Sequence, residues 1–264
     1  MSLLLLTVLL AAGPTAESMV LFGPPRPLGE RLEAVSAKFL GVAYVASPLG
    51  EGKGKDPDPL IRYDAVDCLT FVEETIALSL ASSPESVVPL LTRIRYEGES
   101  PDYEARNHVM EAQWLPSNLK KGFLKDVTRA VGGPQTVRVK KRLDDAAWAS
   151  RSGAWLGLSP EGQRRGDFEW DLIPASAAQE RLKAAPTGTV VVVVRADRPR
   201  MVTRISHVGF LIHKKKALFL RHASRSFGKV VDEPLANYLG RNLAYAKWTV
   251  EGVSLYAVQP VLSP

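Results

Sequence analysis

The chain has few of the residues on which disulfides and metal sites depend. Cys68 is the only cysteine among 264 residues, so no internal disulfide can form. No Cys-x-x-Cys or His-Glu-x-x-His pattern occurs, and we predict no metal site and no cofactor. Lys and Arg form no dense block with interleaved aromatic residues, which argues against nucleic acid as a partner. The formal net charge of +6 permits an anionic partner but identifies none.

Long hydrophobic runs are also missing. The apolar run Leu3–Ala12 has ten residues, whereas a membrane-spanning helix needs about 20. Its length and the small residues after it are typical of a signal peptide, although no Lys or Arg precedes it. The alternative is a buried N-terminal helix. We predict a signal peptide over residues 1–16, a periplasmic or secreted protein, and no stable membrane anchor after its removal.

Two segments in the first third of the chain have the periodicity of amphipathic helices. Residues 28–40 place Leu32, Val35 and Phe39 on one face. The second segment follows Asp67, a favourable N-cap residue, and stops at Ser82-Ser83-Pro84. Its apolar stripe consists of Leu69, Val72, Ile76 and Leu80.

Strand patterns dominate the last third of the chain. Five consecutive valines, Val190–Val194, predict a strand buried on both faces. The runs ISHVGFLI and ALFLRHAS then flank HKKK and predict two further strands, whereas residues 94–185 are interpreted as a loop-rich insertion. Helices followed by strands predict an α+β fold with an antiparallel sheet. With 45% hydrophobic residues, residues 17–264 can form a single domain.

The lone cysteine lies where the second helix is expected to begin. A thiol acts as a nucleophile only as thiolate, and the positive end of a helix dipole or a nearby imidazole favours that form. Asp67 opposes it electrostatically unless its carboxylate caps the helix. Taken alone, a cysteine near an apolar helix is more often a packing residue, so the sequence around Cys68 leaves both interpretations open.

The histidines supply a candidate base. Of the four, His108, His207, His213 and His222, two lie in the strand-like runs around HKKK. A hairpin that turns at Lys214-Lys215 would place His207 directly opposite His222 on one face of the sheet. One ring could then accept the thiol proton while the other orients it, with Gly209 leaving room for a backbone or a substrate. The alternative is a pair of structural histidines. His213 is expected to be solvated.

These residues resemble the NlpC-type (NlpC/p60) cysteine peptidases of bacterial cell-wall turnover. The resemblance rests on DCLTF at a helix start, SHVGFLI on one strand and RHAS on the next. It implies a papain-like α+β fold in which the nucleophile helix packs on an antiparallel sheet. By position it implies that Cys68 is the nucleophile, His207 the base and His222 the orienting residue.

The resemblance is closer to a branch described as N-acetylmuramoyl-L-alanine amidase-like, formerly a domain of unknown function. It extends from about residue 39 to 224 and includes the block IRYEGESPDYEARNHVMEAQWLPSN. It implies hydrolysis of the amide between the lactyl group of N-acetylmuramic acid and L-alanine, with peptidoglycan or muropeptides as substrate. The chain departs from common relatives in DCLT, where they have DCSG, and in Gly188-Thr189, where they have Gly-Asp.

The same block supplies candidate substrate-binding residues. Aromatic side chains could stack on a sugar, Arg106 could pair with a peptide carboxylate, and His108 could donate to a sugar oxygen. The full candidate set is Asp67, Tyr96, Tyr103, Arg106, His108 and Trp114. Core packing is the alternative for the aromatic residues, and a solvated surface charge is the alternative for Arg106. Trp148, Trp155 and Trp170 are interpreted as packing residues.

Three other functions remain compatible with these residues. A stem-peptide endopeptidase would use the same nucleophile on a different bond, and an acyltransferase would pass the thioester to an amine or hydroxyl. A non-catalytic muropeptide-binding protein would keep the pocket without the chemistry. The leading expectation is a cell-wall amidase with a cysteine nucleophile, whose preference among sugar ends is open.

Overall fold

The computed structural model describes residues 14–20, 26–215 and 217–260, so the apolar run Leu3–Ala12 lies outside the described residues. The helices in these ranges are α1 (Ala16–Met19), α2 (Leu28–Lys38), α3 (Cys68–Leu80), α4 (Val87–Arg95), α5 (Leu115–Lys120), α6 (Thr128–Gly132), α7 (Asp145–Trp148), α8 (Arg151–Leu156), α9 (Ala175–Arg181) and α10 (Leu235–Leu243). The strands are β1 (Ala43–Tyr44), β2 (Ala65–Val66), β3 (Leu124–Asp126), β4 (Val137–Leu143), β5 (Gly166–Pro174), β6 (Val190–Arg195), β7 (Ile205–Lys214), β8 (Ala217–Ser224), β9 (Lys229–Pro234) and β10 (Val250–Val258).

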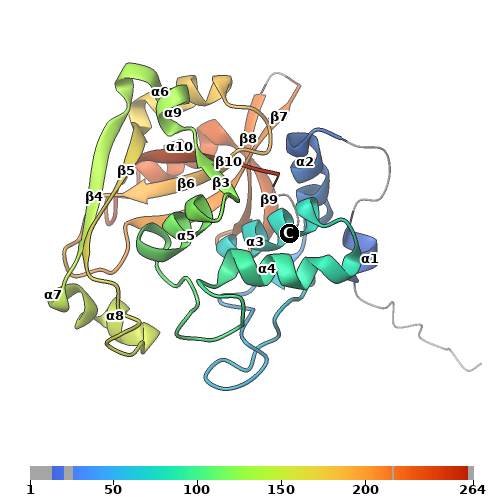
Figure 1. The fold of residues 1–264 in the computed structure, drawn as a ribbon. Helices are drawn as coiled ribbons and strands as arrows, with labels where there is room; N and C mark the ends of the chain where they lie inside the picture. The colour runs from blue at the N-terminus through green and yellow to red at the C-terminus, as the bar shows by residue number, and fades with distance from the viewer. Residues whose placement is uncertain (1–13, 21–25, 216, 261–264) are drawn as a thin grey trace, which may run out of the picture.

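One curled sheet joins all ten strands of the described residues (Figure 1). Its order is β2-β1-β9-β8-β7-β6-β10-β5-β4, and β3 pairs separately with β10. Only β1 and β2 run parallel among these pairs. The prediction of an α+β fold with an antiparallel sheet is therefore confirmed. No helix among the described residues is both long and apolar enough to cross a membrane.

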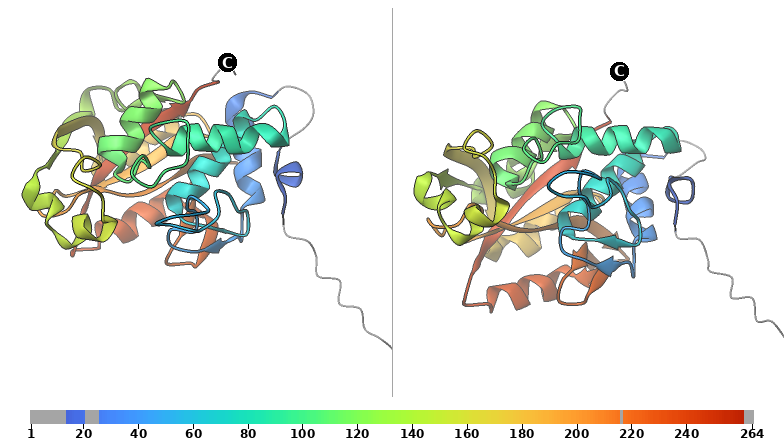
Figure 2. Two further views of the ribbon diagram at one scale, coloured as in Figure 1. Left: turned by 60° about the horizontal axis from the view of Figure 1, so that its bottom comes forward. Right: turned by 90° about the horizontal axis from the view of Figure 1, so that it is seen from below.

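Helices cover both faces of this sheet, so its central strand is buried on each side. Helices α2, α3 and α4 lie on one face, and α9 and α10 lie on the other (Figure 2). Val190, Val192 and Val194 pack toward the first group, whereas Val191 and Val193 pack toward the second. The alternation follows from the two-residue period of a strand and confirms the prediction for Val190–Val194.

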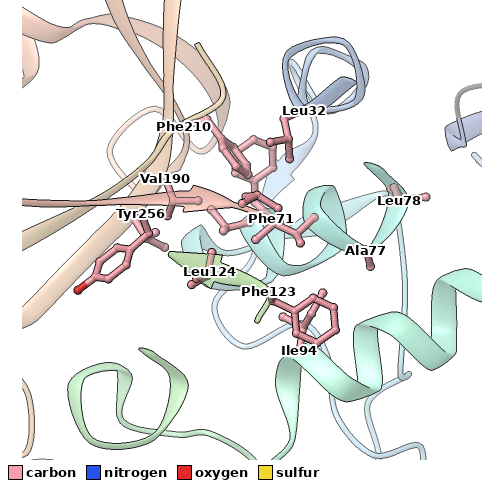
Figure 3. Close-up of a cluster of buried hydrophobic side chains, with 14 of the residues drawn as sticks. Leu32, Phe71, Ala77, Leu78, Ile94, Phe123, Leu124, Val190, Phe210 and Tyr256 are labelled. Atoms are coloured by element: carbon pink, nitrogen blue, oxygen red, sulfur yellow. The ribbon is translucent and has the colours of Figure 1, made fainter. Parts of the chain in front are cut away.

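Helix α3 is the central helix of the first face. Asp67 caps it: its Oδ1 accepts hydrogen bonds from the N–H groups of Leu69 and Thr70, at 3.0 and 2.8 Å. The ring of Phe71 meets Phe210 of β7 edge to face at 5.7 Å, and Figure 3 shows Phe71 between the helix and the sheet. Cap and packing together hold the first turn of α3 against β7.

The predicted register of the β7–β8 hairpin is wrong by two residues. Lys214 pairs with Ala217 and Phe210 pairs with Arg221, so the turn lies one residue later than expected. His207 and His222 are consequently diagonal neighbours rather than directly opposed. Because the shift is even, both rings still lie on the same face of the sheet.

The space beside Gly209 is filled by the neighbouring strand β8. A Cβ atom at this position would lie 2.6 Å from the backbone oxygen of Arg221 and 2.9 Å from the Cβ of His222. The missing side chain therefore lets the backbone of β8 approach, which is one of the two expected occupants, and it makes room for His222.

The region from 94 to 185 contains more regular structure than the sequence pattern indicated. It includes β4 and β5, which pair along their lengths: Val137 is opposite Leu172 at one end, and Leu143 is opposite Gly166 at the other. Strand β5 also joins β10 through Ile173 and Val253, so the region extends the main sheet.

The close fit at Gly209 generates a stability prediction. Gly209→Ala should lower the free energy of unfolding by about 1–3 kcal/mol, because the added Cβ forces β7 and β8 apart. Gly240→Ala is the matched control, since nothing lies within 4 Å of a Cβ there. In helix α10 that substitution should raise stability by about 0.5–1 kcal/mol. Chemical denaturation measures both, and equal effects would contradict the packing described.

Candidate active site

Cys68 is the first residue of α3, and its side chain is half-buried. The sulfur lies next to the backbone of β7, where the N–H of Val208 points at it. Asp67, which is adjacent in sequence, has both carboxylate oxygens engaged: Oδ1 caps α3 and Oδ2 accepts the Ser47 N–H at 3.1 Å. Its role in the structure is to hold the helix start and the preceding loop.

A hydrogen-bonded chain of three side chains extends from β7 across two neighbouring strands. His207 Nε2 lies 2.7 Å from His222 Nδ1, and the two rings are nearly perpendicular with centroids 4.7 Å apart. His222 Nε2 lies 3.2 Å from Oε2 of Glu233 on β9. His222 is 1% exposed, so this chain is sealed from solvent at its centre.

The carboxylate at the end of the chain determines which nitrogens carry protons. A carboxylate only accepts, so His222 must donate from Nε2, which makes its Nδ1 an acceptor in the neutral ring. His207 then donates from Nε2 and keeps its lone pair on Nδ1. We infer this tautomer pair from the hydrogen bonds, and it leaves His207 with a free basic nitrogen.

Helix α10 supports the chain from the other side. Arg241 pairs with Glu233 through Nη2, at 2.8 and 3.1 Å from the two carboxylate oxygens. Tyr238 stacks on His207 with a ring separation of 5.7 Å and meets His222 edge to face at 5.4 Å. The ring positions are therefore restricted by packing as well as by hydrogen bonds.

Burial shifts the pKa of the thiol and the pKa values of the imidazoles in opposite directions. It raises the pKa of the Cys68 thiol to about 12, and the Asp67 carboxylate adds to this, while the N–H groups of Val208, Cys68 and Leu69 act against it. Burial lowers the pKa of His207 well below its ordinary value, and that of His222 to about 4 despite Glu233. These shifts favour the neutral forms of the thiol and of both imidazoles.

The sulfur and the nearer ring are not joined by a hydrogen bond among the described residues. A proton transfer between them therefore requires the two groups to approach each other when substrate binds. In the described ranges the N–H of Cys68 has no hydrogen-bond partner other than its own sulfur, whereas those of Leu69 and Thr70 donate to Asp67. It is therefore the donor of this turn that remains for an oxyanion.

A hollow of about 330 Å³ opens at the start of α3, with Asp67, Leu69, Arg95, Arg106 and Trp155 among its lining residues. We call it the polar hollow because charged side chains are among these residues. Arg95 is 5% exposed; it donates to the Leu49 oxygen at 2.6 Å, but its Nε and Nη1 have no hydrogen-bond partner in the described structure. Its nearest carboxylate is Glu73, 3.9 Å away. Burial raises the pKa of Glu73 to about 7.

The predicted binding residues divide between this hollow and the core. Arg106 lines the hollow but already pairs with Glu51 and Asp56, at 2.5 and 2.8 Å, so it is not the solvated charge considered as the alternative. His108 lines it too, with Nε2 2.7 Å from the Tyr103 oxygen. Tyr103 donates to the Leu156 oxygen at 2.8 Å.

Two of the predicted aromatic residues are core residues in the structure. Tyr96 is buried, and its hydroxyl donates to Glu51 at 2.9 Å. Trp114 is fully buried, and its indole N–H donates to Glu73 at 2.8 Å. Neither lines a hollow described here, so the core-packing alternative describes both. His213 lies on an exposed strand end, with Nε2 2.8 Å from the Ala185 oxygen.

A second, mainly apolar hollow of about 620 Å³ lies next to the polar one. His108, Trp155 and Leu156 line both hollows. The apolar hollow also reaches Thr203 and Ile205 at the beginning of β7, close in sequence to His207. In the described ranges, no group of three or more His, Cys, Asp or Glu side chains could hold a metal ion.

Sequence reasoning missed several residues of this site. Glu233 could have been found as a diagonal neighbour of His222, but only with the register of β9, in which His222 pairs with Val231. Tyr238 and Tyr44 belong to elements distant in the chain. Burial raises the pKa of both, and the nearby Cys68 adds to this. Arg95 gave no signal, since basic residues at a helix end are common.

Comparisons with known proteins agree with the closer of the two resemblances, the one to the N-acetylmuramoyl-L-alanine amidase-like branch. Over 88% of this chain and 89% of the other, the fold is similar to that of a Legionella pneumophila protein at 27% identity, with a TM-score of 0.78. Two crystal structures of an N-acetylmuramoyl-L-alanine amidase from Bacteroides uniformis match at 25% identity. Their TM-scores are 0.69 and 0.68, and the matches cover 87% and 88% of this chain and 99% of the other. No curated protein matches.

The family comparison covers most of the chain, including Cys68 and all three members of the hydrogen-bonded chain. The matching family is AmiA-like, described as N-acetylmuramoyl-L-alanine amidase-like, and the match extends over residues 34–244. This chain therefore belongs to the AmiA-like, N-acetylmuramoyl-L-alanine amidase-like family.

Proposed function

We propose that the protein is a thiol-dependent N-acetylmuramoyl-L-alanine amidase that acts on muropeptides. The observation that carries the proposal is the chain His207–His222–Glu233, which leaves a basic nitrogen on the residue next to Val208, whose N–H points at the sulfur of Cys68. Membership of an amidase-like family supports peptidoglycan as the substrate class. Export to the periplasm or the medium is part of the proposal and rests on the run Leu3–Ala12.

The first half of the reaction transfers the lactyl acyl group to the enzyme. Cys68 Sγ attacks the lactyl carbonyl carbon while its proton moves to Nδ1 of His207. The carbonyl oxygen becomes an oxyanion, which the N–H of Cys68 stabilises. His207 then returns the proton to the nitrogen of L-alanine, the C–N bond breaks, and the peptide leaves as an amine.

The second half hydrolyses the thioester. Water attacks the same carbon while His207 accepts one of its protons, and the C–S bond breaks as the thiolate regains a proton. The sugar leaves with a free lactyl carboxylate. In both halves His222 and Glu233 keep His207 in the tautomer that accepts at Nδ1, and they stabilise the ring while it is positive.

Replacement of the nucleophile tests the thiol mechanism. Cys68→Ala should lower kcat for release of a peptide beginning at L-alanine by roughly 10⁴-fold or more, because no acyl-enzyme can form. The readout is mass analysis of products from a disaccharide-tetrapeptide, and an unchanged melting temperature shows that the fold is retained. Residual activity near that of the native enzyme would refute the mechanism. Release of a shorter peptide by the native enzyme would instead identify an endopeptidase.

Removal of the Glu233 charge tests the orienting chain. Glu233→Gln should lower kcat by about 10²- to 10⁴-fold with little change in KM, because the amide can donate to His222 and reverse both tautomers. Asp232→Asn is the matched control: its carboxylate pairs with Arg221, so its loss should affect stability more than kcat. Equal kcat values for the two variants would show that Glu233 is only structural.

The lowered histidine pKa values predict the acid limit of activity. His222 has a pKa of about 4, so its Nδ1 stays an acceptor down to that pH, and activity is lost as the pH falls through it. The profile of kcat/KM should therefore bend at about pH 4, below the ordinary histidine value of about 6.5. An acid limb at the ordinary value would mean that the rings titrate as solvated groups.

A further inference from the structure

Trp155 differs from the other tryptophans of its region. Its side chain is 77% exposed, the largest value among the exposed large hydrophobic residues of the described structure, whereas Trp148 and Trp170 are 4% and 5% exposed. The interpretation of all three as packing residues is therefore wrong for Trp155. An exposed indole beside a hollow offers a broad apolar face to a ligand.

The segment that carries Trp155 is firmly attached to the rest of the protein. Helix α8 begins at the Ser150 cap and ends at Gly157, which adopts the left-handed conformation that favours glycine, with φ of 58°. The adjacent Leu156 is buried in a small apolar cluster, and its oxygen accepts the Tyr103 hydroxyl at 2.8 Å. Figures 1 and 2 show α7 and α8 together at the end of the molecule opposite α1. The exposure of Trp155 is therefore a feature of a packed helix.

The two hollows that meet at Trp155 differ in chemistry. The polar hollow contains Arg95, whose Nε and Nη1 lack hydrogen-bond partners in the described structure, and it borders the first turn of α3. The apolar hollow is nearly twice as large, with about 620 against 330 Å³, and leads to the start of β7. The polar hollow borders Cys68 through the neighbouring residues Asp67 and Leu69, and the apolar hollow reaches Ile205, two residues before His207.

The bond in the proposed reaction also joins two parts of opposite character. On one side is a sugar without charge, whose pyranose C–H groups form an apolar face that can lie flat on an indole. On the other side is a peptide that carries carboxylates, which match a hollow lined by the guanidinium groups of Arg95 and Arg106. We propose that Trp155 and the apolar hollow bind the muramoyl sugar, and that the polar hollow takes the peptide. This assignment rests on the proposed amidase function.

The test compares substrates with and without the sugar. Trp155→Ala should raise KM for a disaccharide-tetrapeptide by about 10-fold, the loss expected for one aromatic stacking contact. For the matching N-lactoyl tetrapeptide, which has the same scissile amide and no sugar, KM should change by less than about twofold. Trp155→Phe should recover most of the affinity. Leu119 is an exposed apolar residue on α5, and Leu119→Ala should change KM for neither substrate.

Binding measurements separate this assignment from the chemistry. In the Cys68→Ala background, calorimetry should show that Trp155→Ala weakens binding of the disaccharide-tetrapeptide about 10-fold. The affinity for the N-lactoyl tetrapeptide should stay unchanged. That result supports the sugar site whichever bond the native enzyme cuts. Equal losses for the two ligands would assign Trp155 to the peptide, and no loss for either would remove it from the site; both outcomes overturn the proposal.

Discussion

The contact between Glu233 and His222 is the interaction on which the proposed chemistry depends. Both groups are buried, so the carboxylate has Arg241 and the imidazole as its partners rather than water. In a site of low dielectric constant, an acceptor at Nε2 determines the tautomer of His222 and, through it, that of His207. Without this contact, His207 could carry its proton on Nδ1 and could not act as the base of the proposed reaction.

Burial explains why such a chain is needed. It raises the pKa of Cys68 and lowers those of His207 and His222, so the ion pair of thiolate and imidazolium is not the resting state. The start of α3 alone does not overcome this, because Asp67 adds an opposing charge. In the proposed reaction the thiolate therefore forms together with attack on the carbonyl, in a step that the Cys68 N–H and the oriented imidazole support.

Local signals in the sequence predicted those parts of the structure that depend on local physics. The Asp67 cap, the end of α3 and the doubly buried valine strand all follow from neighbouring residues, and the structure confirms them. The site needed longer-range information. The hairpin turn lies one residue later than the lysines suggested, and the two histidines share a face because the resulting shift is even. Glu233 depends on the register of β9, which no local pattern specifies.

The exposure of Trp155 was equally inaccessible from the sequence. A short helix with Trp155 and Leu156 side by side gives no indication of which residue faces inward, and the surrounding cluster decides it. Strand β4 shows a related difficulty. Its many charged residues are typical of a loop in the sequence, and its strand structure depends on pairing with the distant β5. The papain-like arrangement implied by the motifs stays a prediction, whereas the mostly antiparallel α+β sheet is established.

The most direct measurement of the central claim is the ¹⁵N NMR spectrum of the imidazole rings at neutral pH. The account predicts that His207 and His222 are both neutral and both protonated at Nε2, with unprotonated Nδ1 nitrogens. A proton on Nδ1 of His207, or a positively charged ring in the resting enzyme, would contradict it.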